Sequence, residues 1–288
     1  MIKKGIILAG GMGTRMSPLT KAVNKQLLPL YDKPLIYYPL SVLMLAGIRN
    51  ILIIVNKGQL NQFKKILPEK NNFGVKLQYK EQQKPGGLPE AFIIGEKFIG
   101  KDNVSLILGD NFFYGQNLTK ILKKSISLKS GAKIFLHPVK KPNLYGVASI
   151  KQNNKVVKLV EKPKKTFSNL AVTGLYFFDN KVVAYSKKLK PSKRKELEII
   201  DLLNKYKRDK KLKAEQIGRG GTWLDTGNIQ DYYNASNYIS VIESRQGLKI
   251  ACLEEIALTN NWIGKKNILD AIKFYGKCEY ADYLEHLI

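Results

Sequence analysis

An apolar run, Lys4-Gly5-Ile6-Ile7-Leu8-Ala9, leads directly into a glycine-rich one, Gly10-Gly11-Met12-Gly13-Thr14-Arg15. The first run predicts a buried parallel strand, and the glycines after it predict a tight turn. Because glycine has no side chain, the backbone N–H groups of such a turn can approach a phosphate closely, while Arg15 and the nearby Lys25 can neutralise its charge. The stretch therefore predicts a phosphate site at the end of the first strand.

The glycine turn matches neither of two common phosphate motifs. No Gly-Lys-Ser or Gly-Lys-Thr follows at the spacing of a Walker A loop, and Met16 occupies the third glycine position of the dinucleotide fingerprint. The turn therefore favours a nucleoside phosphate that undergoes phosphoryl or nucleotidyl transfer rather than hydride transfer.

Apolar spacing along the chain predicts strands that alternate with helices. Helical spacing recurs at 34–47, 60–67, 88–98, 118–126, 196–206 and 229–245, and in the last forty or so residues. Strands are expected at 51–55, 75–79, 103–108, 133–139, 145–150, 155–160 and 171–178. The early alternation is typical of βαβ units and a parallel sheet, whereas Gln152-Asn153-Asn154 predicts a hairpin turn among the later strands.

The composition excludes several classes of protein. The 288 residues carry a formal charge of +26, but 43 of the 49 basic residues are Lys, and base or phosphate recognition favours Arg. We therefore expect no nucleic-acid partner, and keep a binder of acidic surfaces as an alternative. The longest apolar runs, such as 51–55, are too short for a membrane helix, and no signal peptide is recognisable, so we expect a cytoplasmic protein without a membrane partner.

Two cysteines and two histidines are too few for a disulfide framework or a zinc site, so any metal must be held by carboxylates, which favours Mg²⁺. Asp110 follows the apolar strand 103–108, at the edge where open α/β sheets bind ligands, although it could equally cap the next helix. Asp225 lies between a strand and a turn. Glu161-Lys162-Pro163 ends another strand, and by itself this pair is typical of a solvated ion pair.

The order of these motifs resembles the glucose-1-phosphate thymidylyltransferase family, the dTDP-glucose pyrophosphorylases among the sugar nucleotidyltransferases. The resemblance covers nearly the whole chain and rests on Gly10-Gly11-x-Gly13-Thr14-Arg15, Lys25-Gln26-Leu27-Leu28-Pro29, Asp32-Lys33-Pro34, Leu108-Gly109-Asp110-Asn111, Tyr145-Gly146-Val147, Glu161-Lys162-Pro163, Ala171-Val172-Thr173-Gly174-Leu175-Tyr176, Glu196-Leu197-Glu198-Ile199, Trp223-Leu224-Asp225-Thr226-Gly227 and Arg245-Gln246-Gly247-Leu248-Lys249.

The resemblance implies an α/β fold of the nucleotide-diphospho-sugar transferase type: a Rossmann-like mixed, mainly parallel sheet flanked by helices, with a small C-terminal helical subdomain. The catalytic domain would span residues 1–245, with a nucleotide-binding part at about 1–130 and a sugar-binding part at about 131–245, and the helical subdomain would span 246–288. The implied reaction joins dTTP and glucose 1-phosphate into dTDP-glucose and pyrophosphate, the first step of dTDP-sugar synthesis such as that of dTDP-rhamnose. The family also implies a homotetramer.

The resemblance further implies a role for each site residue. Asp110 and Asp225 would hold Mg²⁺, and Arg15 and Lys25 would bind the pyrophosphate group that leaves. The catalytic set would be Arg15, Lys25, Asp110, Lys162 and Asp225. The nucleotide would contact Gly10, Gly11, Gly13, Thr14, Arg15, Gln82, Gly87 and Asp110, with Gln82 and Gly87 at the thymine. The sugar phosphate would contact Tyr145, Gly146, Glu161, Lys162, Val172 and Arg194.

Two further alternatives stay open beside this function and the binder of acidic surfaces. One is a uridylyltransferase or another nucleotidyltransferase for a related sugar 1-phosphate, because thymine and uracil differ by a single methyl group. The base loop also departs from the family, since Gly86 and Glu90 stand where relatives often carry Asp and Gln. The other alternative is a non-catalytic sensor of nucleotide sugars that kept the fold.

Overall fold

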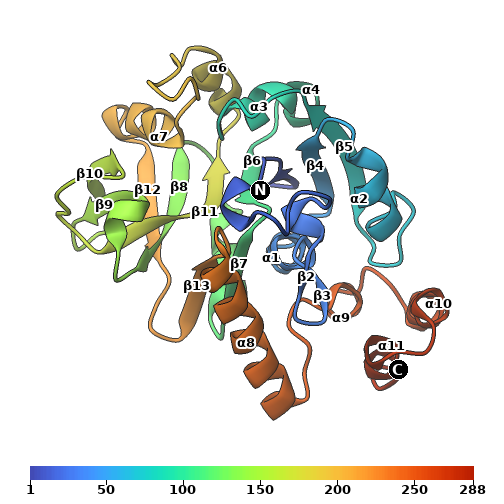
Figure 1. Ribbon diagram of the computed structural model, residues 1–288. Coiled ribbons are helices and arrows are strands. Elements are labelled where there is room, and N and C mark those ends of the chain that lie inside the picture. Colours follow the sequence, from blue (N-terminus) through green and yellow to red (C-terminus); the bar gives the residue numbers. More distant parts are fainter.

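Strand β1 (Lys4–Ala9) lies in the middle of a nine-stranded sheet in the computed structural model, which describes residues 1–288 (Figure 1). The strand order is β10-β9-β11-β6-β1-β4-β5, and β8 pairs with both β11 and β12. The other strands of this sheet are β4 (Asn50–Asn56), β5 (Lys76–Gln82), β6 (Val104–Leu108), β8 (Ala132–Pro138), β9 (Gly146–Ile150), β10 (Val156–Glu161), β11 (Leu170–Phe178) and β12 (Leu212–Gln216).

Only β11 and β10 run against the direction of the other strands. Strand β1 is parallel to β4 and β6, and β4 is parallel to β5, as the βαβ rhythm predicts. Strand β11 is antiparallel to β6, β8 and β9, so these three keep the direction of β1. The expected mixed, mainly parallel sheet flanked by helices is confirmed.

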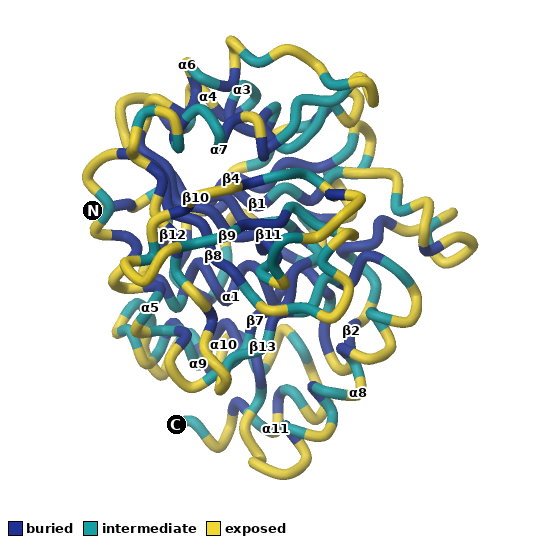
Figure 2. The backbone as a smooth tube through the Cα atoms, turned by 90° about the vertical axis from the view of Figure 1, so that its left-hand side faces the viewer, coloured by how far each residue is buried: buried dark blue, intermediate teal, exposed yellow.

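Two hydrophobic cores lie on opposite faces of this sheet, since successive residues of a strand point to opposite sides. Ile7 of β1 belongs to one core with Leu40 and Leu122, whereas its neighbour Ile6 belongs to the other with Phe92 and Leu203. Figure 2 shows the buried central strands between two helical layers. The first layer contains α1 (Tyr37–Leu45), α2 (Leu60–Ile66), α5 (Leu118–Ser125) and α9 (Leu253–Thr259); the second contains α3 (Glu90–Ile94), α4 (Glu96–Ile99), α6 (Lys181–Lys187) and α7 (Ile199–Arg208).

The C-terminal part of the chain is helical, as expected. The long helix α8 (Ile229–Gln246) ends at Gly247, whose φ of 66° is the left-handed conformation that terminates helices. Helices α10 (Lys265–Tyr275) and α11 (Glu279–Glu285) follow α9 and pack around a small core of their own, which includes Ile268 and Leu284 (Figure 1). No helix in the chain combines the length and the apolar character needed to cross a membrane.

Several elements depart from the expected pattern. The helix expected at 88–98 is divided into α3 and α4 at Gly95, and helix α6 and edge strand β12 were not expected. Strand β5 extends to Gln82, three residues beyond the strand expected at 75–79. Short elements complete the fold: β2 (Pro29–Leu30), β3 (Lys33–Pro34) and the 3-10 turns Thr14–Met16, Lys25–Leu27 and Pro142–Leu144.

The most consequential departure follows Asp110. Instead of capping a helix, Asp110 precedes strand β7 (Asn111–Gly115), which pairs with β13 (Gly221–Asp225) in a separate two-stranded sheet. The helix-cap interpretation of Asp110 is therefore wrong. The β7–β13 pairing instead brings two carboxylates that are far apart in the sequence to the same place.

Candidate active site

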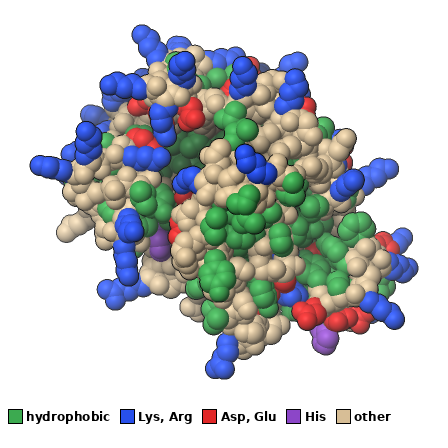
Figure 3. Space-filling model, in the orientation of Figure 1, with side chains coloured by type: hydrophobic (Ala, Val, Ile, Leu, Met, Phe, Trp, Pro, Cys, Tyr) green, Lys and Arg blue, Asp and Glu red, His purple; other side chains and the backbone are tan.

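A cavity of about 330 Å³ opens beside the carboxyl ends of β1 and β6, where Leu8 and Leu108 form part of its wall. Figure 3 shows the hollow with basic and acidic side chains around it. Most residues expected at the site line this cavity: Gly10, Gly11, Arg15, Gln82, Gly87, Asp110, Tyr145, Gly146, Glu161, Lys162, Val172, Arg194 and Asp225. The remaining three, Gly13, Thr14 and Lys25, do not line it, although Lys25 contacts Asp110.

The glycine turn is held in place by one side chain from β4. Asn56 Oδ1 accepts a hydrogen bond from Gly11 N at 2.9 Å, and Asn56 Nδ2 donates to Gly11 O at 2.9 Å. Gly11 has a φ of 102°, a conformation that favours glycine. A side chain at Gly10 would come within 2.6 Å of Gln82 Oε1, so glycine at this position leaves room for the Gln82 amide.

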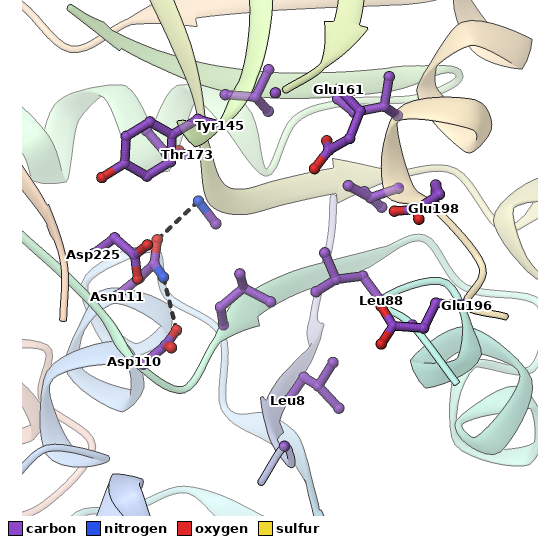
Figure 4. A pocket seen from close by; sticks show the side chains of 18 of the residues that line it. Leu8, Leu88, Asp110, Asn111, Tyr145, Glu161, Thr173, Glu196, Glu198 and Asp225 are labelled. Carbon is purple, nitrogen blue, oxygen red and sulfur yellow. Dashed lines mark hydrogen bonds between the residues drawn. The ribbon is translucent and has the colours of Figure 1, made fainter. Parts of the chain in front are cut away.

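Asp110 and Asp225 converge because of the β7–β13 pairing. Asp225 lies opposite Asn111 in the register, and Thr226 donates to the backbone carbonyl of Asp110 through both its N–H (3.1 Å) and its hydroxyl (2.8 Å). Figure 4 shows both carboxylates on the same side of the cavity. Strand pairing between segments more than a hundred residues apart thus builds the acidic end of the site.

Asn111, which the sequence analysis did not assign to the site, orients this acidic end. Its Nδ2 donates to Asp110 Oδ1 at 3.0 Å, and its Oδ1 accepts from Gly174 N at 2.9 Å and from Trp223 Nε1 at 2.6 Å (Figure 4). With only 1% of its surface exposed, Asn111 is locked into one orientation by these bonds. Its position directly after Asp110 in a family motif was the one available signal.

The two carboxylates have different electrostatic surroundings. Burial raises the pKa of Asp110, but the ammonium group of Lys25, 2.7 Å from Asp110 Oδ2, outweighs this and leaves the pKa below its ordinary value. Asp225 has no ion-pair partner, and burial together with the nearby charge of Asp110 raises its pKa to about 6. Arg15 lies close to Asp225, since both side chains border Gly227. A Cβ atom at Gly227 would lie 2.8 Å from Arg15 Nη2 and would also contact Asp225 Oδ1.

These two carboxylates fit a hard divalent cation bound together with substrate. No group of three or more His, Cys, Asp or Glu residues that could hold a metal is present. Mg²⁺ commonly uses one or two carboxylates and takes its other ligands from water and substrate phosphates. The uncompensated charge of Asp225 is what such a cation would neutralise.

The opposite end of the cavity contains Glu161 and Lys162. Burial raises the pKa of Glu161 against the opposing charge of Lys162, and Lys162 itself is exposed, so the interpretation of a solvated pair stays a prediction. Lys162 has a φ of 41°, a strained backbone conformation outside glycine, and its N–H donates to Tyr145 O at 3.0 Å. The Tyr145 ring packs edge-on against Trp223 at 5.2 Å, between the two ends of the cavity.

Arg194 lines the cavity with its charge already paired. Its guanidinium binds Glu198 through three hydrogen bonds of 2.7 to 3.1 Å and lies 3.9 Å from Glu161. The hydrogen bonds that Arg194 donates to Glu198 raise the pKa of Arg194. Any anion that binds Arg194 would therefore have to share this guanidinium with Glu198 or displace Glu198.

Glu196, Glu198 and Thr173 also line the cavity, and none was assigned to the site from the sequence. The acidic segment is brought in by backbone pairing of Leu197 with Gly87, where Leu197 N donates to Gly86 O at 2.8 Å. Gly87 has a φ of 97°, and a side chain there would come within 2.1 Å of Leu197 O. Glu196 and Glu198 lie two residues apart in a family motif, a spacing that places them on one face of an extended segment.

Comparison with known proteins agrees with this arrangement. The family model described as Nucleotidyl transferase matches residues 4–241. A curated glucose-1-phosphate thymidylyltransferase from Neisseria gonorrhoeae is 50% identical over 285 residues, which make up 99% of this chain and 99% of that protein.

Two solved structures share the fold. A Bacillus anthracis protein described as a candidate glucose-1-phosphate thymidylyltransferase, in complex with sucrose, has a TM-score of 0.75 at 40% identity and covers 82% of this chain and 94% of its own. A UDP-glucose pyrophosphorylase with bound UDP-glucose has a TM-score of 0.73 at 29% identity and covers 84% of this chain and 100% of its own.

Proposed function

The chain belongs to the nucleotidyl transferase family, and from this premise we propose that it acts as a glucose-1-phosphate thymidylyltransferase. A phosphate oxygen of glucose 1-phosphate attacks the α-phosphorus of dTTP, the bond to the β-phosphate oxygen breaks, and dTDP-glucose and pyrophosphate are formed. The observation that carries this proposal is 50% identity along almost the entire length of a protein with that name.

The cavity supports a nucleotide base at Gln82 and Gly87. Gln82 Oε1 and the N–H of Gly87 have no hydrogen-bond partner within the protein, and both residues line the cavity. Together they offer one acceptor and one donor. Thymine and uracil present the matching pair, an N3–H beside a carbonyl oxygen, so the pair favours these bases.

The triphosphate would lie along the glycine turn, with its leaving pyrophosphate near Arg15 and Lys25. The sugar phosphate is already an anionic nucleophile, so the reaction needs no general base. This agrees with a chain that has only two histidines, the residue that most often serves as a general base. What must be overcome is the repulsion between two anions and the charge that develops on pyrophosphate. Arg15, Lys25 and the turn N–H groups supply fixed positive charge and dipoles for this purpose.

We place Mg²⁺ between Asp110 and Asp225, where it would neutralise triphosphate charge. In this arrangement Lys25 restrains Asp110, and Asn111 fixes the plane of its carboxylate. Thr226, through its two bonds to the Asp110 carbonyl, keeps the turn after β13 against β7.

The sugar phosphate would occupy the other end of the cavity. Glu161 would accept hydrogen bonds from sugar hydroxyls, and Lys162 and Arg194 would bind the phosphate. The backbone strain at Lys162 supports a functional role, because such strain concentrates at binding sites. Tyr145, Gly146 and Val172 would line the sugar ring.

A uridylyltransferase is the second candidate, because the fold and 29% of the residues are shared with a UDP-glucose pyrophosphorylase. The single methyl group of thymine supplies only about 1 to 3 kcal/mol of discrimination. The test supplies purified protein with glucose 1-phosphate, Mg²⁺ and either dTTP or UTP, and measures pyrophosphate release. Faster turnover of dTTP supports the first proposal, and clearly faster turnover of UTP overturns it.

We further propose a cytoplasmic homotetramer that begins dTDP-sugar synthesis, such as that of dTDP-rhamnose. Exposed apolar side chains along α8, namely Ile229, Tyr233 and Val241, support a contact between subunits there. Sedimentation velocity tests the assembly, and a monomer at micromolar concentration would contradict it.

A further inference from the structure

Glu90, at the start of α3, joins the end of strand β5 to the loop that follows it. Its Oε2 accepts a hydrogen bond from Gln82 Nε2 and a second one, at 2.9 Å, from Gly86 N. Gln82 itself is buried, with 4% of its surface exposed. One carboxylate thus fixes both the side chain and the loop backbone at the proposed base site.

The Glu90 carboxylate decides the orientation of the Gln82 amide, because it is the hydrogen-bond partner of that amide. A carboxylate only accepts hydrogen bonds, so it holds the NH₂ group of Gln82 and leaves Oε1 for a ligand. No protein group donates to Oε1, which lies close to Gly10 at the wall of the cavity. The side chain therefore presents an acceptor, and not a donor, to a base.

Gly86 makes room for this carboxylate. A side chain at position 86 would begin 2.5 Å from Glu90 Oε2 and 2.7 Å from its carboxyl carbon. Gly86 has ordinary negative φ, so its lack of a side chain is needed for space rather than for backbone conformation. Gly86 and Glu90 therefore form a matched pair.

We propose that Glu90 is a specificity-determining positioning residue, which selects bases that donate from N3 by fixing Gln82 as an acceptor. Thymine and uracil carry a hydrogen at N3, whereas cytosine carries a lone pair there. With Nε2 held by Glu90, Gln82 cannot turn to donate to cytosine, so its oxygen would face the lone pair. This inference rests on the proposed function, because it takes Gln82 as the residue at the base.

The experiment compares dTTP, UTP and dCTP as substrates of the wild type and of Glu90→Ala, by kcat/KM at saturating glucose 1-phosphate. In the variant, Gln82 Nε2 loses the carboxylate that accepts its hydrogen bond, so the amide can turn and present its NH₂ group to the base. We expect the preference for dTTP over dCTP to fall about tenfold or more, since Gln82 can then donate a hydrogen bond to N3 of cytosine instead of accepting one from N3 of thymine. The ratio of dTTP to UTP should not change, because both bases donate from N3.

A double-mutant cycle tests the matched pair. Gly86→Ala should displace the carboxylate and reduce the same preference, whereas adding Gly86→Ala to Glu90→Ala should reduce it little further. Glu96→Ala is the matched control, because Glu96 also begins a short helix but pairs with Lys187 at the surface. Melting temperatures of all variants identify any that fail to fold.

The outcomes separate this inference from the proposed function. If the wild type releases no pyrophosphate from dTTP, the proposed function fails, and nucleotide-induced shifts in melting temperature still measure the preference among the bases. If kcat/KM falls equally for all three nucleotides in Glu90→Ala and in Gly86→Ala, Glu90 has only a structural role and the inference is overturned.

Discussion

Asp225 lies directly opposite Asn111 across the β7–β13 pair, and Asn111 in turn donates to the carboxylate of Asp110. One strand pairing therefore sets the separation of both acidic groups. Since the pairing also orders Trp223, the acidic end of the site and the hydrophobic wall of the cavity depend on the same backbone contact.

Replacing Asp225 tests the metal assignment. We expect Asp225→Asn to lower kcat at least about a hundredfold with little loss of folding, because one of two proposed Mg²⁺ ligands is removed. Pyrophosphate release and circular dichroism measure the two effects. A fully active variant would show that the metal assignment is wrong, and wild-type protein that binds dTDP-glucose without turnover would favour the sensor alternative.

The pKa of Asp225, raised to about 6 by burial and by Asp110, predicts a pH dependence of stability. Because this pKa lies above that of about 3.9 in the unfolded chain, the folded state holds the extra proton, and stability falls as the pH rises from about 4 to about 6. Without divalent cations, Asp225→Asn should remove this loss and gain on the order of 2 to 3 kcal/mol over the wild type at pH 7.

Urea unfolding of both proteins at several pH values measures this difference. The pH dependence that other groups cause is common to both and cancels. A difference in the free energy of unfolding that is constant between pH 4 and pH 7 would contradict the raised pKa.

Arg15→Ala should reduce turnover far more than binding of glucose 1-phosphate. Arg15 lies beside Asp225, at the end of the cavity proposed for the triphosphate. We expect kcat to fall about a hundredfold, because charge on the leaving group loses a fixed cation. Steady-state kinetics with glucose 1-phosphate separate kcat from KM, and comparable losses in both would count against this role.

Asn111→Ala should destabilise the protein as well as inactivate it. The substitution leaves two buried donors, Gly174 N–H and Trp223 Nε1–H, without an acceptor. At about 1 to 3 kcal/mol for each unsatisfied donor, the free energy of unfolding should fall by roughly 2 to 6 kcal/mol. Chemical denaturation measures this, and Asn103→Ala, which affects a partly exposed Asn on loop carbonyls, is the milder control.

The sequence by itself determined the central strands and most helices, and thirteen of the sixteen residues assigned to the site from the sequence line the cavity. Local apolar periodicity suffices for β1, β4 and β6, because these strands are buried on both faces and contain little but apolar residues. The glycine turn was equally recognisable in the sequence, since its backbone conformation excludes most other residues. Asp110 was recognisable as a candidate from its position directly after β6.

Only the tertiary structure decided how distant segments meet. The β7–β13 pair and the contact of Gly87 with Leu197 join segments about a hundred residues apart, and no local pattern encodes such pairings. These contacts turn Asp110 from a possible helix cap into one of two facing carboxylates, and they bring Glu196 and Glu198 to the cavity. The orientation of Gln82 likewise depends on Glu90, because an amide takes its direction from the partner that packing supplies.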